Sequence, residues 1–430
     1  MENKQRNTNY VLSDKTYGNE KISFLEKVAV FTFFAYIFSI FVFTTYANTN
    51  IISKIIFVAF CGVCCLVFFK TRCLKFDIYF WFFAAFMIYI YTSSLWARNA
   101  SLTFEKGFTV TQIIIFCLFA YSLFYSLKNY TVVDKIFYIS GIAMCIYILG
   151  VYGIQNFLNM MQEGERMGEE VGQVNAIGMY AVVSLFIGLY YAMFRKRPIN
   201  YVFVALLFFI ALSTGSKKTI ISIVLCAVLI FFLKFKSEIS FKNIIATLIV
   251  VSLLILAFSY LIKLEAFESI NHRMESIFNL FSGQGKVDSS TSVRMEMIKG
   301  GLEQFKKTPF TGIGIGNTGY INAQKIGWFV YLHNNYVELL AGGGLFGFII
   351  YYSMYAYLLF NLIRLIFKYK NSNAVLALII LFLRLVFEIG AVTYYGKVTY
   401  IYLTYCFLVV KLEYEKLNKE IKRNEIYQKD

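Results

Sequence analysis

The sequence lacks the features of a soluble protein, and it is poor in proline and histidine. Only 15% of its 430 residues are charged and two each are proline and histidine, whereas 59% are hydrophobic and 19% aromatic. No alternation of apolar and polar residues with a period of two is present, which excludes a membrane β-barrel. Residues 1–24 are polar and the first apolar run, at about 28–46, is too long for a signal-peptide core, so we expect no cleavable signal.

Apolar runs of close to twenty residues recur along the chain, and each is long enough to cross a bilayer as an α-helix. Helices satisfy every backbone hydrogen bond within lipid, so we predict an all-α integral membrane protein. The predicted spans number about twelve and are centred near residues 37, 60, 86, 117, 147, 182, 206, 226, 253, 348, 383 and 404.

The net charge of +16 follows the loops between these spans. One set of alternate loops is basic and carries Lys70, Arg72, Lys75, Lys128, Lys135, Arg195, Lys196, Arg197, Lys234, Lys236, Lys242, Arg364, Lys368 and Lys370. Both termini are lysine-rich and fall on the same side, which the positive-inside rule assigns to the cytoplasm. The basic charge is therefore mostly a topology signal, with some attraction to anionic lipid, and no nucleic-acid partner is predicted.

A single large loop interrupts the pattern. The predicted order is a cytoplasmic tail (1–27), nine spans (28–262), an outer loop (263–332), three spans (333–411) and a cytoplasmic tail (412–430). Within the loop, Ile298, Leu302 and Phe305 recur at helical spacing, with N-cap candidates at 289–292 and a stop at Pro309. We predict an amphipathic helix at the outer membrane boundary.

A few basic residues break the positive-inside rule. They are Arg98, Lys106, Arg166, Lys217, Lys218 and Lys397. Arg166 lies among acids before the sixth span, and the two lysines of STGSKK (213–218) lie in a tight turn at the N-terminus of an outward-pointing helix, where anions bind readily. Each alone suits a solvated loop. Together with Arg294 and His333 they predict a cationic cup for a phosphorylated substrate.

The segment YLHNNYVELLAGGGLFG (331–347) places His333 at the outer end of the tenth span. A neutral imidazole there can act as a general base, and a helix N-terminus and nearby cations would lower its pKa. Asn334 and Glu338 are four residues apart and share a helix face. The glycines that follow are interpreted as helix packing. The alternative for His333 is a hydrogen-bonding residue of the membrane interface.

Three other sequence patterns could indicate functional sites, but the support for such sites is weaker. GIGNTG (314–319) fits GxGxxG, but no strand precedes it and no βαβ unit encloses it, so we predict a turn. Arg384 and Glu388 lie four apart in the eleventh span, either as functional intramembrane charges or as a structural ion pair. The CxxCC of residues 61–65 lies in an apolar helix without further ligands, so we predict no metal site there.

In their order, several segments resemble the O-antigen ligase and polymerase superfamily of bacterial membrane glycosyltransferases. The matching pieces, between about residues 160 and 350, are Arg166 with Asn175, the TGSKK turn, VRMEMIKGGLEQFKKTPFTGIGIGN (293–317) and LHNNYVELLAGGGLFG (332–347). The helix count, the cytoplasmic termini and the large outer loop also fit. This chain departs at Lys217, where the family commonly has arginine: lysine keeps the charge but loses the bidentate fork.

The resemblance implies a metal-independent enzyme without cofactors in the bacterial cytoplasmic (inner) membrane. Its donor is a glycan on undecaprenyl pyrophosphate at the outer face, and an acceptor hydroxyl attacks the anomeric carbon as lipid pyrophosphate leaves. A flippase and a chain-length regulator of the same pathway are expected partners, along with membrane lipids. Independently, the outer loops hold no acidic cluster suited to Mg²⁺ or Mn²⁺.

Roles follow from the resemblance and the residue chemistry. We predict as catalytic residues His333, Arg294 and Glu338. We predict as pyrophosphate ligands Arg166, Lys217, Lys218 and Arg294. We predict as further site-lining residues Asn175, Asn334, Arg384 and Glu388.

The segments 308–317 and 333–344 look more like a polymerase, which moves a growing O-antigen or capsule chain onto a lipid-linked repeat unit. The alternative is a ligase, which moves the finished chain onto lipid A–core or another acceptor. A flippase or secondary transporter would also suit twelve spans, but it predicts repeated halves and polar residues at the midplane. No repeat is found, and the polar residues gather at the outer ends.

Overall fold

The computed structural model describes residues 22–43, 49–72, 74–162, 167, 171–235 and 289–427. Over these residues the chain is helical, without a strand, which confirms the all-α prediction. The helices are α1 (Phe24–Phe43), α2 (Thr49–Thr71), α3 (Ile78–Ser93), α4 (Ala100–Ser126), α5 (Thr131–Tyr152), α6 (Ile154–Gln162), α7 (Val174–Phe194), α8 (Asn200–Ser213), α9 (Lys217–Phe235), α12 (Ser289–Lys307), α13 (Gly319–Ile326), α14 (Asn335–Phe367), α15 (Ala374–Glu388) and α16 (Lys397–Tyr427).

Every predicted span except the one near residue 253 coincides with a helix, and that one lies outside the described residues. Six helices are long and apolar enough to cross a membrane: α1, Ile51–Thr71 of α2, α4, α5, α7 and α14. Helices α3 and α8 are shorter and apolar. The chain is therefore a membrane protein, whereas the number of about twelve spans and the side on which each loop lies stay predictions.

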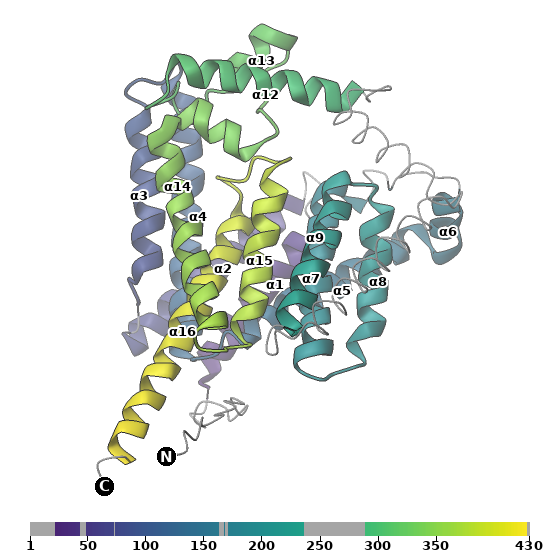
Figure 1. The fold of residues 1–430 in the computed structure, drawn as a ribbon, viewed down its shortest axis with the longest axis vertical. Coiled ribbons are helices and arrows are strands. Elements are labelled where there is room, and N and C mark those ends of the chain that lie inside the picture. The colour runs from purple at the N-terminus through teal and green to yellow at the C-terminus, as the bar shows by residue number, and fades with distance from the viewer. Residues whose placement is uncertain are drawn as a thin grey trace, which may run out of the picture.

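The predicted amphipathic helix is present as α12, and it lies across one end of the helix bundle, while the C-terminal part of α16 extends from the opposite end (Figure 1). The predicted N-cap residues 289–292 form its first turn instead of preceding it. Its buried positions are Met297, Gly300 and Gly301, whereas Leu302 of the predicted apolar stripe is 40% exposed. Ile298 of the predicted stripe packs against the buried cluster that includes Met297 and Val337, so the prediction was wrong only in part, for Leu302. The two glycines allow close approach: a Cβ at Gly301 would lie 2.5 Å from Val337 of α14.

Glycines also shape α14, which is broken at Gly344 (φ 62°, ψ −166°). The segment after α12 hydrogen-bonds at the break: the amide of Leu345 donates to the carbonyl of Pro309 (2.8 Å) and that of Phe346 to Phe310 (3.1 Å). A Cβ at Gly344 would overlap the Phe310 backbone. The packing interpretation is thus confirmed, with an irregular segment as the partner. The segment 314–319 forms turns and the start of α13, as predicted.

Candidate functional site

The predicted site residues that the structure describes come mainly from four elements near the α12 end of the bundle (Figure 1). These elements are the N-terminus of α9, the first turns of α12, the segment before α14 and the loop after α15. Arg166 lies outside the described residues.

A tight turn places the two lysines at the start of α9. The hydroxyl of Thr214 donates to the carbonyl of Ala211 (2.6 Å) and accepts from the amide of Ser216 (3.3 Å), and Gly215 supplies a positive φ of 54°. The side chains then diverge. The ammonium group of Lys217 donates to the hydroxyl of Thr291 on α12 (3.0 Å), and that of Lys218 donates to the carbonyl of Gly390 (2.6 Å). The α9 dipole adds positive potential at the same place.

Arg294 lies on α12, one turn after Thr291, and therefore on the face that Lys217 contacts. It is half-buried. Within the part of the chain that the structure describes, its guanidinium has no hydrogen bond and no carboxylate partner. Its charge acts on two rings of the segment before α14, those of Tyr331 and His333. Arg294 is thus a cation near the predicted base, without an anionic partner among the described residues.

His333 occupies a constrained position immediately before α14. Its backbone is left-handed (φ 57°), which is uncommon for a residue with a side chain. The next residue, Asn334, is the N-cap of α14: its side-chain oxygen accepts from the amide of Val337 (3.0 Å), and its nitrogen donates to the carbonyl of Ile389 (2.9 Å). The imidazole packs 4.3 Å from the ring of Tyr331, measured between centroids. These contacts fix the ring beside the lysine turn and α12.

The electrostatic environment holds the imidazole neutral. Burial, followed by the charges of Arg294 and Lys218, lowers the pKa of His333 from 6.5 to about 4. The sequence predicted the direction and the role of cations, but not that burial is the largest cause. At neutral pH the ring therefore carries a free nitrogen lone pair, as a general base requires.

Glu338 is buried and lies behind this segment. One carboxylate oxygen accepts from the hydroxyl of Thr318 (2.5 Å) and the other from the amide of Leu332 (2.9 Å), the residue before His333. Glu338 therefore anchors the backbone that carries His333. Its catalytic role stays a prediction, while its contacts are those of a positioning residue.

Arg384 and Glu388 do not form the ion pair that their spacing suggested. Arg384 donates to the hydroxyl of Thr399 (2.7 Å) and to the sulfur of Met179. The Glu388 carboxylate accepts four hydroxyl groups, those of Tyr351 (3.2 Å), Tyr352 (2.8 Å), Tyr355 (2.6 Å) and Thr393 (2.8 Å). Glu388 ends α15, so its side chain meets the tyrosines of α14 and the following loop instead of the preceding turn.

That loop is held to α14 by a residue the sequence reasoning missed. The side-chain oxygen of Asn335 accepts from the amides of Thr393 (2.8 Å) and Tyr394 (3.0 Å), and its nitrogen donates to Tyr352 (3.1 Å). The loop also carries Gly390, the acceptor for Lys218. Asn335 is the second asparagine of the pair that follows His333, and of this segment only His333, Asn334 and Glu338 were predicted as site residues from the sequence.

Asn175 is the second residue of α7, and Gly178 one turn later packs against the threonines that flank the two lysines, Thr214 and Thr219. The remaining exceptions to the positive-inside rule have other surroundings. Arg98 lies over the ring of Tyr320 at 4.3 Å, Lys106 lies over Tyr395 at 4.5 Å, and Lys397 lines a separate pocket. The cationic cup therefore comprises Lys217, Lys218, Arg294 and the neutral His333 among the described residues.

No group of three or more His, Cys, Asp or Glu side chains that could hold a metal ion is found among the residues that the structure describes. The independence from metals stays a prediction.

Comparison with known proteins identifies the region that contains the cup. A protein-family model described as O-antigen ligase matches residues 201–352, which include Lys217, Lys218, Arg294, His333 and Glu338. No match was found among curated proteins. An O-antigen ligase transfers a glycan, so the match supports a glycosyltransferase-type enzyme in a membrane, although it does not separate ligase from polymerase. Over residues 201–352 the chain is similar to the O-antigen ligase family, which supports the predicted resemblance to the superfamily of O-antigen ligases and polymerases.

Proposed function

We propose that this protein is a polysaccharide polymerase of the bacterial cytoplasmic membrane. It transfers a growing glycan from undecaprenyl pyrophosphate to a lipid-linked O-antigen or capsule repeat unit at the outer face. The observation that carries the proposal is that two cations, Arg294 and Lys218, act on a neutral, fixed imidazole, while Lys217 contacts α12 one turn before Arg294, all within the region that matches the family. A flippase would supply the lipid-linked unit, and a chain-length regulator would act beside the polymerase.

The cations suit the leaving group. A pyrophosphate departs readily once its charge is stabilised by preorganised donors in a site sheltered from water. Lys217 and Lys218 meet the N-terminal dipole of α9, and Arg294 faces them from α12. Arginine can bind phosphate through two parallel hydrogen bonds, whereas each lysine acts as a point charge. We assign the pyrophosphate to these three residues and, from the family resemblance, to Arg166.

His333 suits the acceptor hydroxyl. In the proposed step, a hydroxyl oxygen of the acceptor forms a bond to the anomeric carbon of the donor sugar. The bond from that carbon to the pyrophosphate oxygen breaks, the electron pair leaves with the lipid pyrophosphate, and the hydroxyl proton passes to the imidazole. General base catalysis of this kind typically contributes about 10²–10⁴-fold to the rate. Glu338 and Asn334 hold the imidazole in position.

Donor binding strengthens the base. In the free protein the charges of Arg294 and Lys218 disfavour an imidazolium. A bound pyrophosphate would offset those charges, so the pKa of His333 should rise toward its ordinary value of about 6.5 when the donor is present. The imidazole would then accept a proton more readily only after the leaving group is in place.

A ligase is the second candidate, because the description of the matching family names that activity. Both enzymes would use the same donor and the same cup. They differ in the acceptor, which is lipid-linked in the polymerase and a lipid A–core or other surface anchor in the ligase.

A deletion strain complemented with the wild-type gene, His333→Ala or His272→Ala tests the proposal. His272 is the only other histidine and serves as the matched control. We expect the wild type and the control to give a polysaccharide ladder on a gel, and His333→Ala to give single repeats at equal membrane levels. A preserved ladder that never reaches its surface anchor would indicate a ligase. An unchanged pattern in the deletion strain would contradict both.

A further inference from the structure

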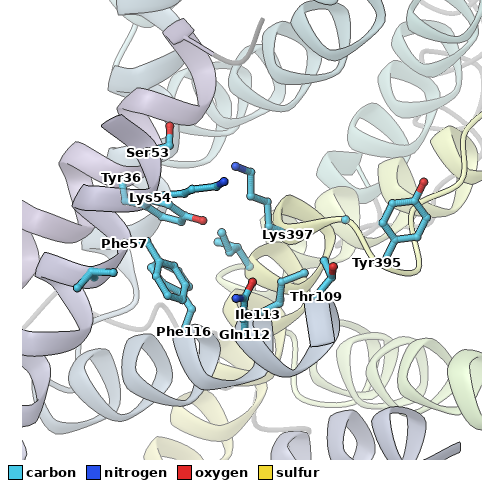
Figure 2. Close-up of a pocket in the computed structure, with 13 residues that line it drawn as sticks. Tyr36, Ser53, Lys54, Phe57, Thr109, Gln112, Ile113, Phe116, Tyr395 and Lys397 are labelled. Carbon is cyan, nitrogen blue, oxygen red and sulfur yellow. The ribbon is translucent and has the colours of Figure 1, made fainter. Parts of the chain in front are cut away.

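A second basic site lies outside the matched family region, in a pocket of about 610 Å³ formed by α1, α2, α4, the loop after α15 and the start of α16 (Figure 2). Lys54 of α2 and Lys397 of α16 point their ammonium groups toward each other across this pocket (Figure 2). The charge of Lys54 acts on Lys397. Neither lysine has a carboxylate partner within the part of the chain that the structure describes.

Two facing ammonium groups are unfavourable at the edge of a membrane unless an anion binds between them. Lys54 lies only four residues into the candidate span Ile51–Thr71. The pocket also offers the side-chain amide of Gln112 as a neutral donor, whereas the hydroxyls of Ser53 and Thr109 already have partners in Ser39 and the carbonyl of Glu105. Ammonium and amide groups are suitable donors for phosphate oxygens.

The rest of the pocket is apolar. Phe57, Phe116 and Tyr36 form an aromatic wall, with ring centroids 4.5 Å apart for Tyr36 and Phe116 and 5.6 Å apart for Phe57 and Phe116. Val58 lines the pocket and is 66% exposed, so the cavity adjoins the surface of α2 that would face lipid. A ligand that fits this combination has a phosphate head and a long hydrocarbon chain.

Tyrosines connect the pocket to the candidate base. Tyr395 lines the pocket, and in the view of Figure 2 Lys397 lies between it and Lys54. Burial is the main cause of the raised pKa of Tyr395, with smaller contributions from Glu338 and from Tyr331, whose ring packs against His333. The pocket therefore lies in the neighbourhood of the segment that carries His333.

We propose that the pocket between Lys54 and Lys397 binds the pyrophosphate of a second polyprenyl-linked glycan, the acceptor, while the cationic cup binds that of the donor. This inference rests on the proposed function, because a polymerase joins two lipid-linked substrates and needs a place for each head group. A ligase would need one. The polyprenyl chain would lie along the apolar wall and continue into the membrane.

Binding stoichiometry tests this inference. The full-length protein is placed in nanodiscs of phosphatidylcholine, which has no net charge, and titrated with radiolabelled undecaprenyl pyrophosphate. We expect two lipids per protein for the wild type and one for the double variant Lys54→Gln/Lys397→Gln. Each lysine lost should weaken the second binding event roughly ten-fold or more. Lys54→Arg/Lys397→Arg should retain two, as should Lys70→Gln, which removes an exposed lysine from the other end of α2.

The pattern of outcomes separates the two proposals. If Arg294→Gln/Lys218→Gln loses one lipid and the Lys54/Lys397 variant loses the other, both stand. One lipid in the wild type that depends only on Arg294 and Lys218 would overturn the second site and leave the proposed function intact. No binding in the wild type would contradict the proposed function itself.

A competition arm identifies the source of the phosphate. Phosphatidylglycerol that displaces the second lipid at equal concentration would show a general site for anionic phospholipid and overturn the acceptor assignment. Thermal melting checks the fold: removing two mutually repelling charges that have no carboxylate partner among the described residues should leave the melting temperature unchanged or raised, although Lys397 also lies over the ring of Tyr36 at 5.8 Å. A ladder shortened by the Gln pair and restored by the Arg pair is the expected result in cells.

Discussion

Replacement of Arg294 by glutamine should raise the pKa of His333, because it removes a positive charge that disfavours the imidazolium. Burial is the largest cause of the low value, Arg294 the second and Lys218 the third. The substitution therefore recovers only part of the difference between about 4 and 6.5. We expect a rise of roughly 0.5–1 pKa unit, equivalent to about 0.7–1.4 kcal/mol of interaction between charges. Lys218→Gln should give a smaller rise.

The chain suits this measurement because it contains only two histidines. With ¹³C-labelled histidine, two imidazole signals are expected in detergent micelles, and His272→Gln assigns them. Each variant is titrated between about pH 3.5 and 8. The matched control is Lys299→Gln, which removes an exposed cation from the same helix, one paired with Glu296 at 3.2 Å. A wild-type value near 6.5, or no change in Arg294→Gln, would refute the electrostatic account of the site.

Four further predictions follow from the same geometry. Lys217→Arg should keep polymer formation and Lys217→Glu should abolish it on a polysaccharide gel, since the cup requires the charge; equal activity of the two would contradict the cup. In pH profiles with a purified donor, kcat/KM should fall only toward about pH 4, where His333 of the free enzyme gains a proton. The value of kcat should fall at a higher pH, because the bound pyrophosphate raises the pKa of His333. A fall of both quantities at the same pH would argue against this coupling. Glu338→Leu should lower the free energy of unfolding by about 1–3 kcal/mol, because the buried amide of Leu332 loses its acceptor. Glu338→Gln should lower it less. Equal melting temperatures of the two variants would contradict the anchoring role. Gly344→Ala should lower the melting temperature strongly, because a Cβ there overlaps the Phe310 backbone, whereas Gly62→Ala, with no atom within 4 Å of the added Cβ, should have little effect.

The spans and the cup were predictable from the sequence for different reasons. Apolar runs of sufficient length have few alternatives to a helix, so each predicted span within the described residues coincides with a helix. The cup was predictable because lysine and arginine are rare in short outer loops, which makes exceptions informative. Two of these exceptions to the positive-inside rule are Lys217 and Lys218, and Arg294 lies in the predicted large loop. The structure brings all three to one end of the bundle with His333.

Other features depend on contacts that spacing does not encode. The i,i+4 rule suggested a pair between Arg384 and Glu388, but each side chain binds residues distant in sequence or beyond the helix end, namely Thr399 for Arg384 and three tyrosines of α14 with Thr393 for Glu388. The Lys54–Lys397 pocket joins helices almost 350 residues apart in sequence, so neither lysine identifies the other. In α12, the prediction considered only large apolar side chains and left out Gly300 and Gly301, although these glycines form the buried face together with Met297.

Among the residues that the structure describes, His333 has no carboxylate partner, which agrees with the proposed chemistry. A carboxylate beside the imidazole would raise its pKa and retain the proton after transfer. Here Glu338 is close in sequence but directs its oxygens to Thr318 and the amide of Leu332. When the lipid pyrophosphate leaves, the charges of Arg294 and Lys218 are no longer offset, and an imidazolium with a pKa near 4 loses its proton at neutral pH. The cations that stabilise the leaving group would therefore also regenerate the neutral base. A carboxylate bonded to the imidazole would oppose this step, and Glu338 instead holds the backbone before His333.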